Sequence, residues 1–211
     1  TTHIISSKKF SEYTDFPMPE DYPDYPSGEE LLAYFNSYVE KYNLKKFIKF
    51  NTNVKKAVNI DNKWKLFFDD LSEDYDYLVV ANGHHWSPRI PTFEGEFSGE
   101  LMHSHQFKNN EYFKDKSVLV VGGGNSACDI AVEVSRVAKK TSISMRRGYH
   151  FIPKFMMGMP SDVYYAKSLW IPQRLRLILQ KLALRIVQGS YKDYGLQKPD
   201  HDILQSHATI N

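Results

Sequence analysis

Apolar residues recur at helical spacing in two well-separated stretches of the chain. In the first, residues about 3.6 positions apart form one apolar face after Ser27, which with Glu30 makes the Ser-x-x-Glu pattern of a helix capping box. In the second, a helix is predicted from Gln173 to Gln188. Its apolar side is formed by Leu175, Ile178, Leu179, Leu182 and Ile186, with Arg174, Lys181 and Arg185 largely elsewhere. The first helix is expected to face a core. The second is expected to pack against another protein surface, with a membrane surface as the alternative.

Short runs of β-branched and aromatic residues predict strands after the first helix, and prolines predict a loop before it. The strands are expected at 47–50, 54–60, 64–68 and 75–80, with the acidic segment 69–74 as a turn. Residues 1–26 contain Pro17, Pro19, Pro23 and Pro26, which disfavour helices and strand ladders. This first segment is therefore expected to be an extended, ordered loop whose aromatic side chains pack onto a neighbouring surface.

A strand–helix–strand pattern follows in the second half of the chain. The strand Ser117–Val121 and the strand Ser142–Met145 flank a stretch with apolar residues at helical spacing. Those residues are Ile130, Ala131, Val134 and Val137. Such a unit is typical of a parallel sheet in an α/β fold.

The turn between that first strand and the helix is rich in glycine. Gly122, Gly124 and Ala127 fit the pattern Gly-x-Gly-x-x-Gly/Ala. One glycine allows a sharp turn, the second lets a pyrophosphate approach the backbone, and a small third residue lets the helix pack closely. Asn125 or Ser126 is expected to cap the helix, whose N-terminus attracts anions. The pattern predicts a dinucleotide site, with an ordinary tight turn as the alternative.

The end of the second strand indicates which dinucleotide binds. An NAD site usually places a carboxylate about 20 residues after the glycines, where it accepts a hydrogen bond from the ribose 2′-hydroxyl. This chain has Arg146 and Arg147 there instead. Because a guanidinium matches a 2′-phosphate, NADPH is favoured over NADH. The alternative is a solvated basic turn.

A family resemblance rests on four residues upstream of the glycine turn. Phe97, Gly99, His103 and Phe107 resemble the fingerprint of the flavin-containing monooxygenases, the N- or S-oxygenating branch of the class B flavoprotein monooxygenases. The similar Baeyer–Villiger fingerprint ends in Trp followed by Pro or Asp, whereas this chain has Phe107 and Lys108. Four further segments agree with the family: Asp15–Pro19, Phe50–Val54, Ala81–Gly83 and Tyr194–Leu196. The resemblance covers nearly the whole chain.

The resemblance implies an α/β fold, a two-dinucleotide-binding-domain flavoprotein. A Rossmann-like NADPH domain is expected with part of an FAD domain, which carries a small antiparallel β insertion. In this division residues 1–83 are the C-terminal portion of the first FAD-domain segment and 84–95 a linker. Residues 96–150, extending as far as about 200, form the NADPH domain with a helical extension, and 195–211 return towards the FAD domain. On the FAD side the family's residues correspond to Val54, Ala81 and Gly83.

The same resemblance implies an enzyme that uses FAD and NADPH. One oxygen atom of O2 would be inserted, through a flavin hydroperoxide, into a soft nitrogen- or sulfur-containing small molecule, an amine such as N,N-dimethylaniline or a sulfide. No catalytic side chain is assigned, because the cofactor carries the chemistry. The alternatives are a Baeyer–Villiger-type or other NADPH-dependent flavoprotein oxidoreductase, and a non-catalytic NADP(H)-binding module. The chain has Ile4-Ile5 where the family often has Thr-Asn, and no glycine motif precedes residue 95, so an internal fragment, inactive alone, is expected.

Composition narrows the function classes further. With 42% hydrophobic residues among 211 the chain can bury a core, and a net charge of +2 without a basic stripe argues against nucleic acid. The single cysteine, Cys128, excludes an internal disulfide. His84 and His85 lack acidic neighbours at ligand spacing, so no metal is expected. His103 suits a general base, but a structural role is preferred. A cytoplasmic protein is expected, membrane-associated if eukaryotic, and a homodimer is allowed.

Overall fold

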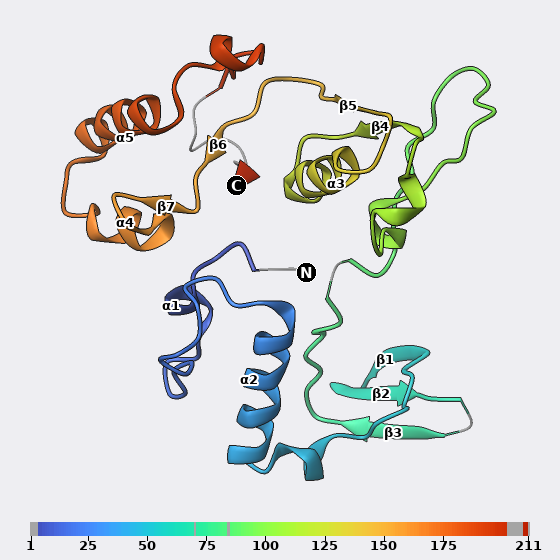
Figure 1. The fold of residues 1–211 in the computed structure, drawn as a ribbon. Coiled ribbons are helices and arrows are strands. Elements are labelled where there is room, and N and C mark those ends of the chain that lie inside the picture. Colours follow the sequence, from blue (N-terminus) through green and yellow to red (C-terminus); the bar gives the residue numbers. More distant parts are fainter. Residues whose placement is uncertain (1–3, 70, 84, 202–208, 211) are drawn as a thin grey trace. The chain divides into compact units, whose positions relative to one another are not determined.

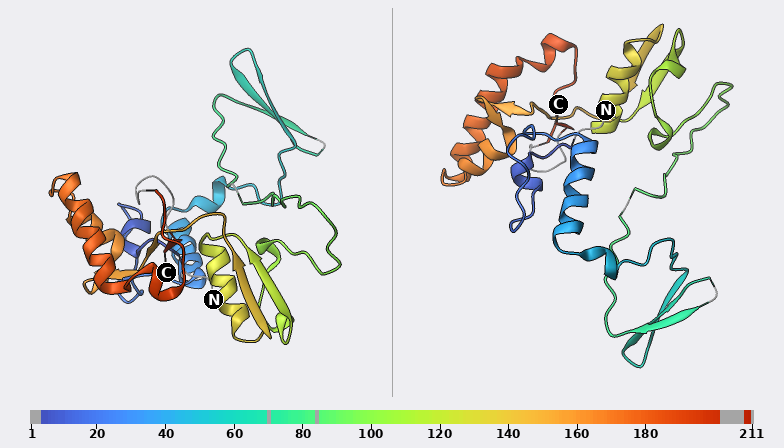
Figure 2. Two further views of the ribbon diagram at one scale, coloured as in Figure 1. Left: turned by 90° about the horizontal axis from the view of Figure 1, so that it is seen from above. Right: turned by 60° about the horizontal axis from the view of Figure 1, so that its bottom comes forward.

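The computed structural model describes residues 4–69, 71–83 and 85–201 and the backbone of 209–210. It divides into two compact units (Figures 1 and 2), one of residues Thr1–Tyr34 with Glu94–Asn211 and one of Phe35–Phe93. The boundary at residue 93 falls inside the segment 84–95 that was predicted to be a linker. The finer domain division stays a prediction.

The unit of residues 35–93 contains a three-stranded antiparallel sheet, visible in Figure 1. Its order is β1-β2-β3, with β1 at Lys56–Ile60, β2 at Lys63–Phe67 and β3 at Ser72–Tyr75. Asp61 and Asn62 join β1 to β2 with positive φ angles of 49° and 62°, as in a tight hairpin whose turn favours these residue types. The antiparallel insertion expected from the sequence is therefore present.

Two of the predicted strands in this unit were wrong. The strand predicted at 47–50 is not formed, and its first residue ends the 3₁₀ helix η1 (Leu44–Phe47). The strand predicted at 75–80 lies instead at 72–75. The turn before β3, closed by a Phe68 N–Leu71 O hydrogen bond of 2.9 Å, sets Ser72 opposite Phe67. Because an antiparallel sheet tolerates polar side chains on an exposed face, this acidic segment can pair, and lysines of the same sheet region contact it. The ion pairs are Lys49–Glu73 at 2.6 Å and Lys65–Asp74 at 3.8 Å.

Residues 76–80, the remainder of the predicted strand 75–80, belong to none of the sheets formed by the described residues. Their valines are largely exposed, Val79 by 85% and Val80 by 74%. A β-branched run has strand propensity, but propensity becomes a strand only where a partner edge is available. Asp70, within the predicted turn 69–74, lies outside the described residues.

Helix α2 (Gly28–Lys41) begins as the sequence predicted. The Ser27 backbone N–H donates to Glu30 Oε2 at 2.7 Å, and the Glu30 N–H donates to Ser27 Oγ at 3.2 Å. This reciprocal pair is a capping box, and it satisfies two amide groups that the helix start leaves without intrahelical partners.

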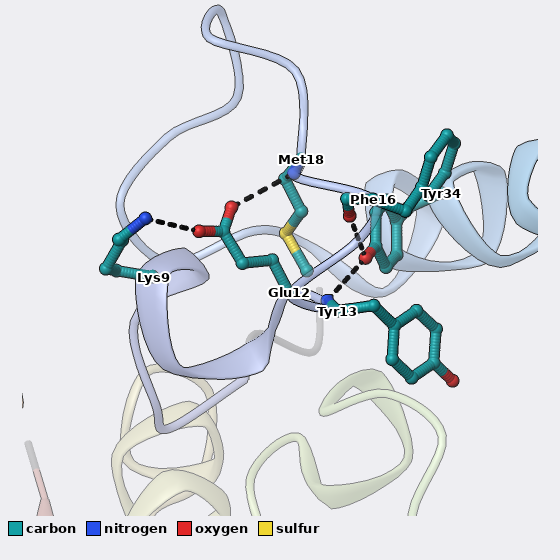
Figure 3. A network of polar contacts seen from close by, with 6 residues as sticks. All are labelled: Lys9, Glu12, Tyr13, Phe16, Met18 and Tyr34. Atoms are coloured by element: carbon teal, nitrogen blue, oxygen red, sulfur yellow. Dashed lines mark hydrogen bonds and ion pairs between the residues drawn. The ribbon is translucent and has the colours of Figure 1, made fainter.

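The hydroxyl of Tyr34, the last residue of the first unit on this helix, organises the proline-rich N-terminal segment (Figure 3). Tyr34 is 1% exposed. Its hydroxyl accepts a hydrogen bond from Tyr13 N at 2.8 Å and donates one to Phe16 O at 2.6 Å. The Phe16 ring stacks on the Tyr34 ring with centroids 5.4 Å apart. Much of this segment is therefore the expected ordered loop, held by buried polar and aromatic contacts, but Lys8–Ser11 form a short helix that was not predicted.

A carboxylate secures the other side of this loop. Glu12 follows the short helix α1 (Lys8–Ser11), and its Oε1 lies 2.7 Å from Lys9 Nζ. Its Oε2 accepts from Met18 N at 3.1 Å (Figure 3). The Lys9 hydrogen bond lowers the pKa of the Glu12 carboxyl, so the contact is charged at neutral pH and is lost as the pH falls through that pKa.

The predicted strand–helix–strand unit is confirmed. Strand β4 (Ser117–Val121) is followed by helix α3 (Asn125–Ser135) and by strand β5 (Lys140–Ser144), and β4 and β5 are parallel. The second strand begins two residues earlier than predicted and ends one residue earlier. Val134 of α3 is fully buried, which fixes the helix on this sheet.

The rest of the first unit consists of short strands and helices. The 3₁₀ helices η2 and η3 precede β4 at Ser104–Gln106 and Glu111–Phe113. After β5 come β6 (Phe151–Ile152), β7 (Phe155–Met156), β8 (Met159–Pro160), α4 (Ser161–Lys167), α5 (Gln173–Gln188), η4 (Tyr191–Tyr194) and β9 (Thr209–Ile210). Helix α5 has the bounds predicted from its pattern. Over the described part of the chain, every helix is too short or too polar to cross a membrane.

Candidate dinucleotide-binding site

The first glycine of the turn makes the sharp reversal that the motif requires. Gly122 has a φ of 129°, in the region that side chains disfavour, and its N–H donates to Ser144 O at 2.9 Å. A Cβ built on Gly122 would lie 3.7 Å from Ala127 Cβ. Gly122 therefore turns the chain off β4, and the small Ala127 lets α3 pack closely against that turn, as predicted.

The second glycine caps the helix. Gly124, with φ −79° and ψ 176°, is the N-cap of α3, and its carbonyl accepts from Cys128 N at 3.1 Å. The prediction that Asn125 or Ser126 caps the helix was wrong, because both lie inside the first turn. A Cβ at Gly124 would meet no atom within 4 Å. The N-cap contributes no side-chain hydrogen bond, and the space beside it, at the positive end of the α3 dipole, is open, as an anion site requires.

The middle glycine has a packing role that the motif did not reveal. A Cβ on Gly123 would lie 2.5 Å from Tyr149 Cε2 and 2.9 Å from Met145 Sδ. The side chains of Met145 and Tyr149, which follow β5, therefore cover the turn, and a side chain on Gly123 would require them to shift. The run of three glycines, where the motif needs two, was the sequence feature that could have indicated this contact.

Arg146 and Arg147 lie in the bend just after β5 and are exposed. Because β4 and β5 are parallel, this bend and the glycine turn share the carboxyl edge of the sheet, where such folds bind ligands. Within the described ranges Arg146 makes no ion pair with a carboxylate. Arg147 likewise makes no ion pair with a carboxylate among the described residues. The hydrogen bond with His201 lowers the pKa of the Asp200 carboxyl, and the charge of Arg147 contributes least to that shift.

The four fingerprint residues form local contacts upstream of β4. The Phe97 ring covers Gly99, where an added Cβ would lie 2.8 Å from Phe97 Cε1. His103 caps η2: its Nδ1 accepts from His105 N at 3.1 Å. The ring of Phe107 stacks on Phe113 with centroids 5.7 Å apart. These contacts favour the structural role that was preferred for His103.

The residues expected on the FAD side lie in the other unit. Val54, Ala81 and Gly83 are exposed, and Gly83 has a φ of 72°. A Cβ at Gly83 would lie 3.8 Å from Trp86 Nε1. His84 of the histidine pair lies outside the described residues. In the part of the chain that the structure describes, no group of three His, Cys, Asp or Glu side chains could hold a metal ion.

Comparison with known proteins shows which family this chain resembles. A family model described as "Flavin-binding monooxygenase-like" matches residues 2–207. Human flavin-containing monooxygenase 5 is 32% identical over 227 residues, covering 99% of this chain and 42% of the relative. Dimethylaniline monooxygenase (N-oxide-forming) 2 of Macaca mulatta is 32% identical over 230 residues, covering 98% and 42%. The structure of S-allyl-L-cysteine S-oxygenase from Allium sativum superposes with a TM-score of 0.64 at 26% identity, covering 69% of this chain and 36% of that one.

The fold is that of the two-dinucleotide-binding-domain flavoproteins, with the glycine turn on its parallel sheet and an antiparallel insertion. The chain belongs to the flavin-binding monooxygenase-like family, whose curated relatives are monooxygenase enzymes, and the resemblance predicted from the fingerprint is confirmed. The chain spans 42% of the length of these curated relatives.

Proposed function

We propose that this protein is an NADPH- and FAD-dependent monooxygenase that transfers one oxygen atom of O2 to a soft nitrogen or sulfur atom of a small molecule. The observation that carries the proposal is the pairing of an open anion position at Gly124 with the exposed cation of Arg146 at one edge of the parallel sheet.

The glycine turn fits the pyrophosphate of a dinucleotide. The space around Gly124 is free of protein atoms within 4 Å of where a Cβ would stand, so a phosphate can reach the backbone there. The first turn of α3 presents backbone N–H groups and the positive end of the helix dipole to that space. Both features favour an anion, and both come from the backbone, so they do not depend on a side-chain conformation.

Arg146 fits the 2′-phosphate that distinguishes NADPH from NADH. A guanidinium donates two parallel hydrogen bonds to a phosphate, and the charge assistance makes them about twice as strong as neutral ones. The same side chain gains little from a 2′-hydroxyl. Since no carboxylate among the described residues pairs with Arg146, its charge is available to a ligand.

FAD, when bound, would supply the activation of dioxygen, and the chain would supply binding and orientation. Val54, Ala81 and Gly83 are the residues expected beside FAD. The substrate class follows from the relatives, one of which forms N-oxides and another of which is an S-oxygenase. Oxygenation of a lone pair on nitrogen or sulfur needs no acid–base pair from the protein, which suits the absence of a catalytic carboxylate pair from the motifs found in the sequence.

The test compares Arg146→Ala with Arg136→Ala in the full-length protein. Arg136 is an exposed arginine at the far end of α3, paired with Glu133 at 3.3 Å, and serves as the matched control. Arg146→Ala should raise the KM for NADPH about ten- to a hundredfold, on the order of 1.4–2.7 kcal/mol, and leave the KM for NADH nearly unchanged. Arg136→Ala should change neither. Equal effects of Arg146→Ala on both cofactors would refute the assignment.

A further inference from the structure

The bend after β5, which carries the two arginines of the candidate site, is fixed at both of its ends. At the near end, Ser144 is the last residue of β5, and its carbonyl accepts a hydrogen bond from Gly122 N at 2.9 Å. At the far end, Gly148 is buried beneath the segment 197–199, and a Cβ there would stand 2.8 Å from backbone atoms of residues 198 and 199. Only residues 145–147 lie between these two ends. The backbone from which the arginines extend therefore has little freedom to move.

A hydrogen bond between two histidines holds the far end in place. His150 Nε2 lies 2.8 Å from His201 O, and because a carbonyl oxygen only accepts, the imidazole donates. The two rings also meet edge to face, with centroids 5.1 Å apart. His201 is anchored in turn, since its Nδ1 lies 2.9 Å from Asp200 Oδ1 and its side chain is only 12% exposed. The bond between His150 and His201 therefore ties residues 197–201 to the chain that leaves the bend.

We propose that His150 is a positioning residue of the 2′-phosphate site. By holding residues 197–201 over Gly148, its hydrogen bond fixes the backbone from which Arg146 and Arg147 extend. A guanidinium donates two parallel hydrogen bonds to a phosphate only when its plane is correctly oriented. A bend that is already ordered meets this requirement before the cofactor arrives, so that binding does not bear the cost of ordering it. This inference rests on the proposed NADPH site.

The effect of His150 should be confined to the cofactor that carries a 2′-phosphate. The open position for the pyrophosphate lies at Gly124, in the turn between β4 and α3, where the Gly124 carbonyl accepts from Cys128 N at 3.1 Å. That bond lies within the helix and does not involve the histidines. Loss of the His150 bond should raise the dissociation constant of NADPH about three- to tenfold, because a loosened bend costs less than the removal of Arg146. The dissociation constant of NADH should change by less than about twofold.

The experiment measures both dissociation constants by titration of the full-length protein and of a matched pair of variants, His150→Gln and His150→Asn. The glutamine amide places an N–H donor about where the imidazole Nε2 lies, whereas the asparagine amide is one methylene shorter and cannot reach His201 O. His150→Gln should bind NADPH as the wild type does. His150→Asn should weaken NADPH binding about three- to tenfold and leave NADH binding nearly unchanged. If His150→Asn does not fold, His150→Phe, which keeps a ring and removes the donor, replaces it in the same comparison.

A second comparison shows whether His150 acts through the arginines. In a protein that carries both Arg146→Ala and Arg147→Ala, the further change His150→Asn should alter the dissociation constant of NADPH by less than about twofold, because no guanidinium remains to be positioned. A merely structural role of His150 would instead weaken the binding of NADPH and NADH together, and would do so in either background.

Three results would overturn the inference. The first is that His150→Asn leaves NADPH binding unchanged or weakens both cofactors alike. The second is that His150→Gln binds NADPH as poorly as His150→Asn does. The third is that His150→Asn costs as much without the arginines as with them. Failure of the proposed function looks different, because the wild-type protein itself would then bind NADPH no better than NADH.

Discussion

Replacing Gly124 with valine should separate cofactor binding from protein stability. A side chain at Gly124 would meet no protein atom within 4 Å, and the backbone there, with φ −79° and ψ 176°, is accessible to any residue. Valine is a poorer N-cap than glycine, which costs about 0.5–1 kcal/mol. It also restricts the unfolded chain, which returns about 0.4–1 kcal/mol. The two effects nearly cancel, so the free energy of unfolding should stay within about 1 kcal/mol of wild type.

The same substitution should abolish dinucleotide binding. The isopropyl group would occupy the space through which the pyrophosphate reaches the first turn of α3, so the dissociation constant of NADPH should rise at least about a hundredfold, or ~2.7 kcal/mol. NADH should lose as much, because both cofactors carry the pyrophosphate. Binding is read by titration and stability by denaturant unfolding of the same samples. Unimpaired NADPH binding by a folded Gly124→Val protein would refute the site.

Gly123→Ala is the matched control, because Gly123 is packed against side chains whereas Gly124 adjoins open space. The new methyl group would collide with the Tyr149 ring at 2.5 Å and with Met145 Sδ at 2.9 Å. Overpacking of this kind costs about 1–3 kcal/mol of stability. Gly123 is therefore needed for the stability of the fold, and Gly124 is needed to keep the ligand site open.

Two further predictions concern buried groups away from the cofactor. Tyr34→Phe would remove the hydroxyl that bonds Tyr13 N and Phe16 O, and it should lower the free energy of unfolding by about 2 kcal/mol. The control Tyr77→Phe, at a side chain 89% exposed, should change the free energy of unfolding by less than about 0.5 kcal/mol. Equal effects of the two variants in denaturant titrations would contradict the network of Figure 3. Burial, and to a smaller extent the charge of Asp129, raises the pKa of the Cys128 thiol, which reduces its thiolate fraction at pH 8. Cys128 of the folded protein should therefore be alkylated more slowly than free cysteine, and unfolding should remove the difference. An alkylation rate of the native protein that matches free cysteine would show that the thiol is not shielded.

Local sequence features predicted the elements around the site. The strand Ser117–Val121, the helix after it and the capping box at Ser27 each depend on residues within a few positions of one another, so spacing alone determined them. Helix α5 was also predicted with its observed bounds, because its apolar period runs uninterrupted from Gln173 to Gln188. The glycine turn belongs to the same group, since its two roles at Gly122 and Ala127 are five residues apart.

Contacts between distant segments were not predictable in the same way. The third strand of the antiparallel sheet is acidic and gave no apolar alternation, and its place at Ser72–Tyr75 comes from the register that the preceding turn imposes. The packing of Tyr149 on Gly123 and the crossing of residues 197–199 over Gly148 join positions 26 and about 50 residues apart. Neither leaves a periodic mark in the sequence.

Monooxygenase activity is tested by supplying the full-length protein with FAD, NADPH, isotopically labelled dioxygen and a tertiary amine or a thioether. NADPH should be consumed in proportion to the N-oxide or sulfoxide that forms, and the added oxygen should carry the label. Consumption of NADPH that yields only hydrogen peroxide, or oxygenated product whose new oxygen is unlabelled, would contradict the assignment of a monooxygenase.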